Sequence, residues 1–569
     1  MANASTETHS RLAFLKTPAF GLGLACFAFA LLIRLVGIGW GLPNDLRHQS
    51  LHPDEPIIWI YSQQIDPAKG DFDPGFYNYG SLYLTTMSVV TRVVDAYGGG
   101  PTGPGEPALW QAIGRYHLAG RIITAVAGAG TAWVVFALLR RRTHVVGATL
   151  GAAIVAVAPG FVVHSRFQTV DVPATFLLAL SLFWALELAL DEGTQGAQAQ
   201  RAALLSGLFA GLSAGTKYTG ILALIALVAV VLPRPDRWRR LAEGSGAALV
   251  AFAVATPGVW LNPTAFLRDF RYEMTHTATG HGLVFAALPS GFSVHVANLA
   301  LAMGPLLLIG GGVGLGAAAF RRYRWAWGLL AYSLAYYVLI GRAEVLFLRY
   351  VLPLVPVLAV GLGWAVGQAH AHADRRWRVA VAGAGLAVVG IGGGGLITTI
   401  LYSQLMTNPD PRDAAAIWLK ANAAGRTLGF VSDPWFQSPP VYPDTALPRT
   451  VQFAERDRRM REARNPQVVR HVPANPNQRA DFDPALLTQE RPDYIVTSSF
   501  ETDDLARVAA RLSSITDPSW RIQAERYQAF TVGLRRDYQV VRAWGSVIPS
   551  AHDLMYVQPR VTLWQRRTP

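Results

Sequence analysis

Long apolar segments recur along the first two thirds of this chain and constrain its fold more than any other feature. The first covers residues 18–40 and follows a polar tail, residues 1–17. A helix of about 20 apolar residues can cross a hydrocarbon core of about 30 Å, so this segment predicts a membrane span. A signal peptide would have a shorter apolar region ahead of a soluble domain, whereas more apolar segments follow here. We therefore expect an uncleaved anchor with a cytoplasmic N-terminal tail.

The composition places the chain in the same class. Hydrophobic residues make up 51% of it and charged residues only 15%, which is typical of a polytopic membrane protein. The formal net charge of +13 could indicate a nucleic-acid partner, but the arginines occur in short clusters between apolar segments. Membrane orientation explains that distribution better, so we expect membrane lipids and no nucleic acid as partners. Cys26 is the only cysteine, which excludes an intrachain disulfide.

The arginine clusters also predict the topology. Residues 41–116 form a first outer loop if the moderately apolar stretch 79–94 is an interfacial helix rather than a span. Ten further spans then follow, at residues 117–139, 144–163, 172–190, 202–216, 218–232, 242–259, 295–318, 325–340, 350–367 and 378–401. The loops assigned to the cytoplasm hold fourteen arginines, and the later outer loops hold six arginines and lysines. This distribution obeys the positive-inside rule, and about eleven spans are expected in all.

The composition changes after residue 401, where Pro, Arg, Asp and Gln become frequent. A helix is expected at residues 413–422, and strands at 427–431, 494–497, 538–541 and 561–564. Residues 455–485 are rich in Arg, Asn and Pro and are expected to be loop. The predicted organisation is a tail at 1–17, a transmembrane domain at 18–401 and a soluble α/β domain at 402–569. An odd number of spans places that domain on the outer face.

One acidic pair lies just after the first span, in the stretch Leu51-His-Pro-Asp-Glu-Pro56. Two adjacent carboxylates in a loop are usually a solvated turn. They are also suited to taking a proton from a reacting group, so Asp54 and Glu55 are the first candidates for catalysis.

A second acid, Asp171, ends the outer hairpin His164-Ser-Arg-Phe-Gln-Thr-Val-Asp171 and precedes Pro173. An Asp before a proline in the first turn is an ordinary helix N-cap, worth about 1 kcal/mol. The sequence leaves the cap and a role in the site open as alternatives for Asp171.

Four cations lie at or near the ends of apolar segments: Arg34, Arg121, Lys217 and Arg349. A cation at the centre of a membrane helix costs about 2.5–3.5 kcal/mol, so each either extends towards water or meets an anion. Several cations on the same side as the acidic pair would be explained by a phosphate ligand.

Three further polar residues, Glu273, His276 and His281, lie in the outer loop 260–294. Their spacing suggests a metal, but two histidines five residues apart lack the i,i+4 relation of a helical metal site. Contact with lipid headgroups or a structural role is the alternative. We assign no metal ligands and no certain cofactor, and leave a divalent metal open.

Taken together, these motifs resemble the GT-C glycosyltransferases, the superfamily of protein O-mannosyltransferases and bacterial lipid A aminoarabinose transferases. The motifs on which this resemblance rests are His52-Pro-Asp-Glu55, Asn78-Tyr-Gly-Ser-Leu-Tyr83, Arg121, His164-Ser-Arg166, Asp171-Val-Pro173, Thr216-Lys-Tyr218 and Arg349-Tyr350 with Pro353. They cover roughly residues 15–400. A proline follows Glu55 where many relatives have a small residue.

The resemblance implies a GT-C bundle and an inverting transfer of a sugar from a polyprenyl-phosphate carrier to an acceptor. It makes Asp54 the base, with Glu55 and Asp171 assisting or positioning the acceptor. Cations would stabilise the phosphate leaving group. Lys217 and Arg349 are the first candidates for this role, and Arg34 and Arg121 are the second. The other candidate site residues are His52, Tyr79, Arg166, Glu273, His276 and His281.

The expected acceptor is a lipid, a glycan or a protein on the outer face of the plasma (inner) membrane. Two alternatives stay open: a ligase or polymerase that moves a lipid-linked oligosaccharide, and a lipid or sugar transporter. Transporters often contain inverted repeats, and no such symmetry is visible in this sequence.

Overall fold

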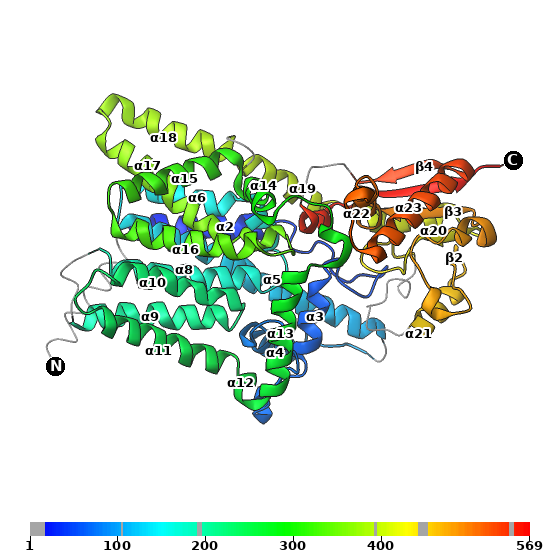
Figure 1. Ribbon diagram of the computed structural model, residues 1–569, viewed down its shortest axis with the longest axis horizontal. Coiled ribbons are helices and arrows are strands. Elements are labelled where there is room, and N and C mark those ends of the chain that lie inside the picture. The colour runs from blue at the N-terminus through cyan, green and yellow to red at the C-terminus, as the bar shows by residue number, and fades with distance from the viewer. Residues whose placement is uncertain are drawn as a thin grey trace.

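The computed structural model describes residues 18–103, 106–190, 196–391, 395–441, 453–545 and 551–568, which are mostly helical. The predicted tail, residues 1–17, lies outside the described residues. Figure 1 shows a bundle of long helices at one end of the molecule and a sheet with its own helices at the other. Helices α3, α4 and α13 lie between these two parts, across the end of the bundle.

The bundle is built from fourteen of the described helices. They are α2 (Pro18–Leu35), α5 (Glu106–Arg140), α6 (Val145–Val157), α7 (Pro159–His164), α8 (Asp171–Glu187), α9 (Gly196–Ala214), α10 (Leu224–Val231), α11 (Arg237–Ala255), α14 (Gly291–Met303), α15 (Pro305–Phe320), α16 (Arg324–Gly341), α17 (Leu354–His372), α18 (Arg375–Gly390) and α19 (Gly395–Thr407).

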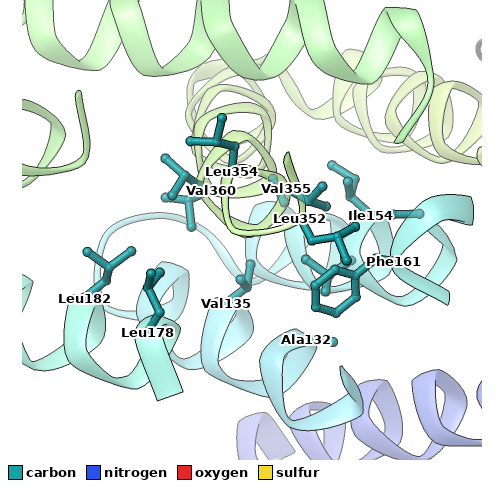
Figure 2. Close-up of a cluster of buried hydrophobic side chains, with 14 of the residues drawn as sticks. Ala132, Val135, Ile154, Phe161, Leu178, Leu182, Leu352, Leu354, Val355 and Val360 are labelled. Carbon is teal, nitrogen blue, oxygen red and sulfur yellow. The ribbon is translucent and has the colours of Figure 1, made fainter. Parts of the chain in front are cut away.

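Small residues let these helices approach one another closely. Helix α17 packs against both α6 and α15, and α9 packs against α8 and α11. A Cβ on Gly147 of α6 would lie 2.2 Å from the carbonyl oxygen of Gly363 in α17. Figure 2 shows the apolar core around α17, where Val355 and Val360 meet Val135 of α5 and Leu178 of α8. Close backbone contact of this kind is a usual way to associate helices in a membrane.

Four segments of the described chain are long and apolar enough to cross a membrane, by length and composition. They are Pro18–Leu35, Ala108–Arg140, Leu354–His372 and a stretch within Arg375–Asn422. A bent pair, α14 with α15, would make a fifth. The described part of the chain therefore contains several helices that are apolar enough to cross a membrane. The expected number of eleven spans stays a prediction.

Several predicted spans are broken in the structure, and two of them show why. The expected span 295–318 consists of α14 and α15, which meet at an angle of 106°. Gly304 between them has a φ of 99° and Pro305 has no N–H to continue the helical hydrogen bonds, which explains the break. The expected span 218–232 begins as a 3₁₀ helix, η2 (Tyr218–Ala223), and only its second half, α10, is α-helical.

Short helices cover the end of the bundle that carries the candidate site. They are α3 (Asp54–Ser62), η1 (Pro67–Lys69), α4 (Leu82–Ala96), α12 (Gly258–Leu261), α13 (Pro263–Thr279), η3 (Gly282–Phe285) and η4 (Leu348–Val351). The helix predicted at residues 79–94 corresponds to α4. It packs against α3 and α5.

After α20 (Pro411–Asn422) the chain forms a five-stranded mixed sheet of order β2-β1-β3-β5-β4. The strands are β1 (Thr427–Phe430), β2 (Gln467–Val469), β3 (Tyr494–Ser498), β4 (Tyr538–Trp544) and β5 (Val561–Arg566). Strand β1 is parallel to β2 and β3, pairing Leu428 with Tyr494, whereas β5 is antiparallel to β3 and β4.

The helices beside the sheet are α21 (Phe453–Glu462), η6 (Pro476–Gln478), η7 (Leu486–Glu490), α22 (Ser499–Ala509), η8 (Leu512–Ser514), α23 (Pro518–Asp537) and η9 (His552–Val557). The prediction of loop for residues 455–485 is wrong, because α21 and β2 lie there. Strand β2 is only three residues long and β1 covers one of its edges, so the local pattern is too short to reveal it.

Candidate functional site

Asp54 is the first residue of α3, where it follows Pro53. Its side chain is 22% exposed, and its Oδ2 lies 3.4 Å from Nη2 of Arg349. The backbone N–H of Asp54 donates to Nδ1 of His52 at 3.3 Å. Asp54 is therefore held at the start of a helix with its carboxylate open to a small molecule.

Asp171 begins α8 and faces the same arginine. Its Oδ1 accepts a hydrogen bond of 2.6 Å from Nζ of Lys217, and its Oδ2 lies 3.9 Å from Nε of Arg349. The interpretation of Asp171 as an N-cap is wrong, since Val170 occupies the cap position and no side chain there caps the helix. The carboxylate contacts Lys217 and Arg349 instead.

The two cations come from breaks between bundle helices. Lys217 follows α9 in extended conformation, and its Nζ lies 4.4 Å from the centre of the Tyr350 ring. Arg349 lies in η4, ahead of Pro353, the N-cap residue of α17. Its guanidinium is 3.9 Å from the centre of the Phe347 ring. Aromatic faces stabilise both cations where water is scarce.

A small pocket lies between these groups. Its lining includes Asp171, Lys217, Arg349, Ser213, Thr219 and Tyr336. One terminal nitrogen of Arg349, Nη1, is buried and has no hydrogen-bond partner in the described part of the chain. A buried donor of this kind favours an anionic ligand, because leaving it unpaired costs free energy.

The charges around Arg349 keep it protonated. Burial alone would lower the pKa of Arg349, but the carboxylates of Asp54 and Asp171 raise it well above its ordinary value. The four charged groups, two acids and two bases, thus form a neutral cluster. Its arginine contacts are longer than hydrogen bonds, so a phosphate can compete for the guanidinium.

Glu55 does not share the position of Asp54. It is fully buried, and its two carboxylate oxygens each accept a 2.7 Å hydrogen bond from Arg121. Gln168 N–H donates to it at 2.8 Å, and the Ser50 hydroxyl also bonds to it. Burial alone would raise the pKa of Glu55, but Arg121 lowers it to about 2.

This closed pair sets Glu55 and Arg121 apart from the more open carboxylate of Asp54. Arg121 also donates to the carbonyl oxygens of Ile38 and Trp40 and has no exposed surface. Neither Glu55 nor Arg121 can reach an acceptor or a phosphate without opening the pair. Both residues brace the loop that carries Asp54.

Arg34 is also placed away from the four charged groups. Its guanidinium donates to the carbonyl oxygens of Ala30, Val155 and Ala156 and to the Ser165 hydroxyl. These contacts join α2 to α6 and occupy the guanidinium that the sequence predicted to bind phosphate. The carbonyls of Val155 and Ala156 are free because α6 ends nearby at Val157, ahead of Pro159.

Arg166 and His52 are buried beside the site rather than in it. Arg166 donates to the carbonyl of Ile33 and the hydroxyl of Ser403, so it ties α19 to α2. His52 lies between the rings of Phe167 and Tyr556, at 4.4 and 4.9 Å. Burial lowers the pKa of His52 to about 4, so it is neutral at pH 7.

The remaining predicted residues form the outer wall. Tyr79 is half-buried, and its carbonyl accepts a 3.1 Å hydrogen bond from the Tyr218 hydroxyl beside Lys217. Glu273 of α13 interacts electrostatically with Lys217 and Arg349, although burial outweighs them and raises its pKa.

His276 and His281 lie on the same outer wall. Nε2 of His276 is 3.1 Å from Nδ1 of His281. Within the described ranges, no group of three or more His, Cys, Asp or Glu side chains is arranged to hold a metal ion.

Sequence reasoning missed Phe347, Asp553 and Tyr556. Phe347 stands two residues before Arg349, but nothing in the sequence marks it as the aromatic support of that arginine. Asp553 and Tyr556 lie about two hundred residues away in η9, and they reach the site only through the fold.

The chain matches a known family over part of its length. Residues 108–260 match the model described as "Dolichyl-phosphate-mannose-protein mannosyltransferase". This range includes Arg121, Asp171 and Lys217 but neither Asp54 nor Arg349. No curated protein matches the chain significantly.

Solved structures show a similar fold. A crystal structure of the Archaeoglobus fulgidus oligosaccharyltransferase, in complex with zinc and sulfate, is 16% identical, with 89% of this chain and 70% of that chain covered and a TM-score of 0.51. ArnT from Cupriavidus metallidurans, bound to undecaprenyl phosphate, is 17% identical, with 95% and 98% covered and a TM-score of 0.48. The archaeal oligosaccharyltransferase AglB from Archaeoglobus fulgidus, with an inhibitory peptide and a dolichol-phosphate, is 16% identical, with 94% and 74% covered and a TM-score of 0.49.

Only the first of these similarities exceeds a TM-score of 0.5, and it shows a shared fold. The family match and this fold together confirm the resemblance to GT-C glycosyltransferases that the sequence predicted.

Proposed function

We propose that this protein is an inverting glycosyltransferase that moves a sugar from a polyprenyl-phosphate carrier to an acceptor. The observation that carries this proposal is the cluster of Asp54, Asp171, Lys217 and Arg349. In it, a partly exposed carboxylate lies beside an arginine with an unpaired, buried nitrogen. The description of the matching family, which names a dolichyl-phosphate sugar, supports the same class of donor.

In the proposed reaction, an acceptor hydroxyl attacks the anomeric carbon of the donor sugar. A bond forms between the acceptor oxygen and this carbon, and the bond from the carbon to the phosphate oxygen breaks with its electron pair. The products are the glycoside and the polyprenyl phosphate. Asp54 takes the hydroxyl proton, since its carboxylate is the more open of the two in the cluster.

Arg349 and Lys217 hold the phosphate of the carrier. The leaving phosphate gains negative charge as the bond breaks, and two fixed cations stabilise that charge without reorganisation. Asp171 bonds to Lys217 and faces Arg349, so it orients both cations rather than touching the acceptor. Glu273, His276 and His281 on the outer wall are placed to meet the sugar or the acceptor.

We also propose the membrane arrangement that the arginine distribution predicts. About eleven spans place the N-terminus in the cytoplasm and residues 402–569 on the outer face of the plasma (inner) membrane. The acceptor is then an extracytoplasmic lipid, glycan or protein. The domain division at residues 18–401 and 402–569 belongs to the same proposal.

An assay of the purified protein with a panel of polyprenyl-phospho-sugars tests the function. Transfer releases one polyprenyl phosphate per sugar moved. A ligase or polymerase would release a diphosphate, and a transporter would move its substrate without forming a bond. The family match favours transfer over both alternatives.

A further inference from the structure

Helix η9, from the C-terminal part of the chain, reaches the candidate site. It packs against η4, the short helix that carries Arg349, and against α19. Asp553 near its start has no exposed surface. None of the motifs read from the sequence includes this residue.

The carboxylate of Asp553 holds the main chain on either side of the Leu348–Arg349 peptide bond. Its Oδ1 accepts the backbone N–H of Leu348 at 3.0 Å. Its Oδ2 accepts the backbone N–H of Arg349 at 2.9 Å and lies 3.3 Å from Nε2 of His164. One carboxylate therefore joins η9 to η4 and to the end of α7.

Burying a carboxylate is costly unless donors surround it, so these contacts indicate a specific role. Burial alone would raise the pKa of Asp553, but the His164 contact and the charge of Arg349 lower it well below its ordinary value. Asp553 is ionised at neutral pH, and its bonds to the two N–H groups are charge-assisted. Such bonds are stronger than those between neutral groups.

The rest of η9 is anchored equally well. The Tyr556 ring stacks on Phe500 of α22 at 5.3 Å, and it lies 4.9 Å from the His52 ring. The Tyr556 carbonyl accepts a 2.5 Å hydrogen bond from Arg412, whose guanidinium also pairs with Asp410. Through these contacts the position of η9 depends on the fold of the C-terminal part.

We propose that Asp553 is a positioning residue for Arg349. By fixing the main chain at Leu348 and Arg349, it directs the guanidinium towards Asp54 and Asp171, and so makes the phosphate site depend on the C-terminal part of the chain. The identity of the ligand, the carrier phosphate, rests on the proposed function. The contacts by which Asp553 fixes the main chain do not depend on that function.

Hydrogen exchange in the full-length protein tests the positional part alone. In Asp553→Ala, the peptide containing Leu348 and Arg349 should exchange about tenfold faster or more, because both amides lose a charge-assisted acceptor. Asp553→Asn keeps an acceptor oxygen, so the exchange rate of this peptide should lie between those of the wild type and Asp553→Ala. Asp493→Ala, which removes a carboxylate that accepts the Thr427 N–H within the sheet, is the matched control. It should leave this peptide unchanged.

Binding of farnesyl phosphate, with farnesol as its uncharged counterpart, tests the consequence. Asp553→Ala should weaken binding of the phosphate about tenfold or more, because a small misplacement of a charged group costs much of its effect. Binding of farnesol should be unchanged in the same variant. General unfolding would affect both ligands, so the difference between them separates positioning from loss of structure.

Faster exchange with selective loss of phosphate binding, graded from Asp553→Asn to Asp553→Ala, is the expected result. Unchanged exchange, or faster exchange with wild-type phosphate binding, would overturn the proposal. If the wild type itself binds no farnesyl phosphate, the proposed function fails, and the exchange experiment still decides whether Asp553 holds Arg349.

Discussion

At the scale of single residues, the Glu55–Arg121 pair should contribute strongly to stability. Both side chains are fully buried, so removing one charge leaves the other without a counter-charge. Glu55→Gln should lower the free energy of unfolding by about 3–5 kcal/mol at pH 7. Thermal melting of the purified variant in detergent checks this. A melting temperature equal to that of the wild type would contradict the assigned role.

The same pair predicts a pH dependence. The pKa of Glu55 is about 2 in the folded protein, below its ordinary value of 4.5. Its contribution is therefore complete above pH 4.5 and is lost as the pH falls towards 2. The stability gap between wild type and Glu55→Gln should shrink over that interval in melting curves. A gap that stays constant from pH 6 to pH 3 would show that Glu55 titrates normally.

Lys217 should contribute to binding of the carrier phosphate. Lys217→Met keeps the length of the side chain and removes its charge, which should weaken farnesyl phosphate binding about 10- to 100-fold. Lys420→Met, an exposed substitution in α20, is the matched control. Isothermal titration measures both variants. Equal affinity in Lys217→Met and the control would remove Lys217 from the site.

The sequence identified the four charged residues that the structure brings together, because each interrupts an apolar segment at a loop. It did not separate them from Arg34 and Arg121. A cation beside an apolar segment can bind an anion, or it can bind carbonyls freed at a helix end. The sequence does not show which carbonyls are near.

At the scale of elements, close packing of α9 on α11 should not tolerate a side chain at Gly207. A Cβ there would lie 1.9 Å from the carbonyl oxygen of Gly244, so Gly207→Ala should cost about 1–3 kcal/mol. Gly246 on α11 has nothing within 4 Å of such a Cβ, and Gly246→Ala should be neutral or slightly stabilising. Melting temperatures of the two variants check this, and equal values would contradict the packing.

The positions of most elements follow from apolar periodicity, but their breaks do not. The bend at Gly304–Pro305 is marked in the sequence by a residue that tolerates positive φ and one that lacks an N–H. Hydropathy averaged over a span conceals it. Strand β2 and α21 escaped prediction because charged, proline-containing segments become ordered only against neighbours such as β1.

At the scale of the whole molecule, the topology proposal can be tested by cysteine labelling. Cys26 is the only native cysteine, so Cys26→Ser gives a background free of thiols. In this background, Ile417→Cys should react with an impermeant reagent added to intact cells, whereas Arg141→Cys should react only after permeabilisation. Labelling of both positions from one side would overturn the topology.

The contact between η9 and η4 could not be predicted from the sequence, because the two segments lie far apart along the chain. The segment at 552–557 carries no motif that the sequence analysis singled out, and its partner lies about two hundred residues earlier. Only the packed molecule brings Asp553 to the backbone of Arg349. Local patterns predicted the candidate site, whereas the support around it depends on long-range contacts.

The most direct test of the central claim is sugar transfer by the purified protein and by its Asp54→Asn variant. Asp54→Asn keeps the shape of the side chain and removes the base, so transfer from a polyprenyl-phospho-sugar should fall about 10²- to 10⁴-fold, with donor binding nearly unchanged. The measurement is the rate of polyprenyl phosphate release at saturating donor. Transfer at the wild-type rate in Asp54→Asn would contradict the account.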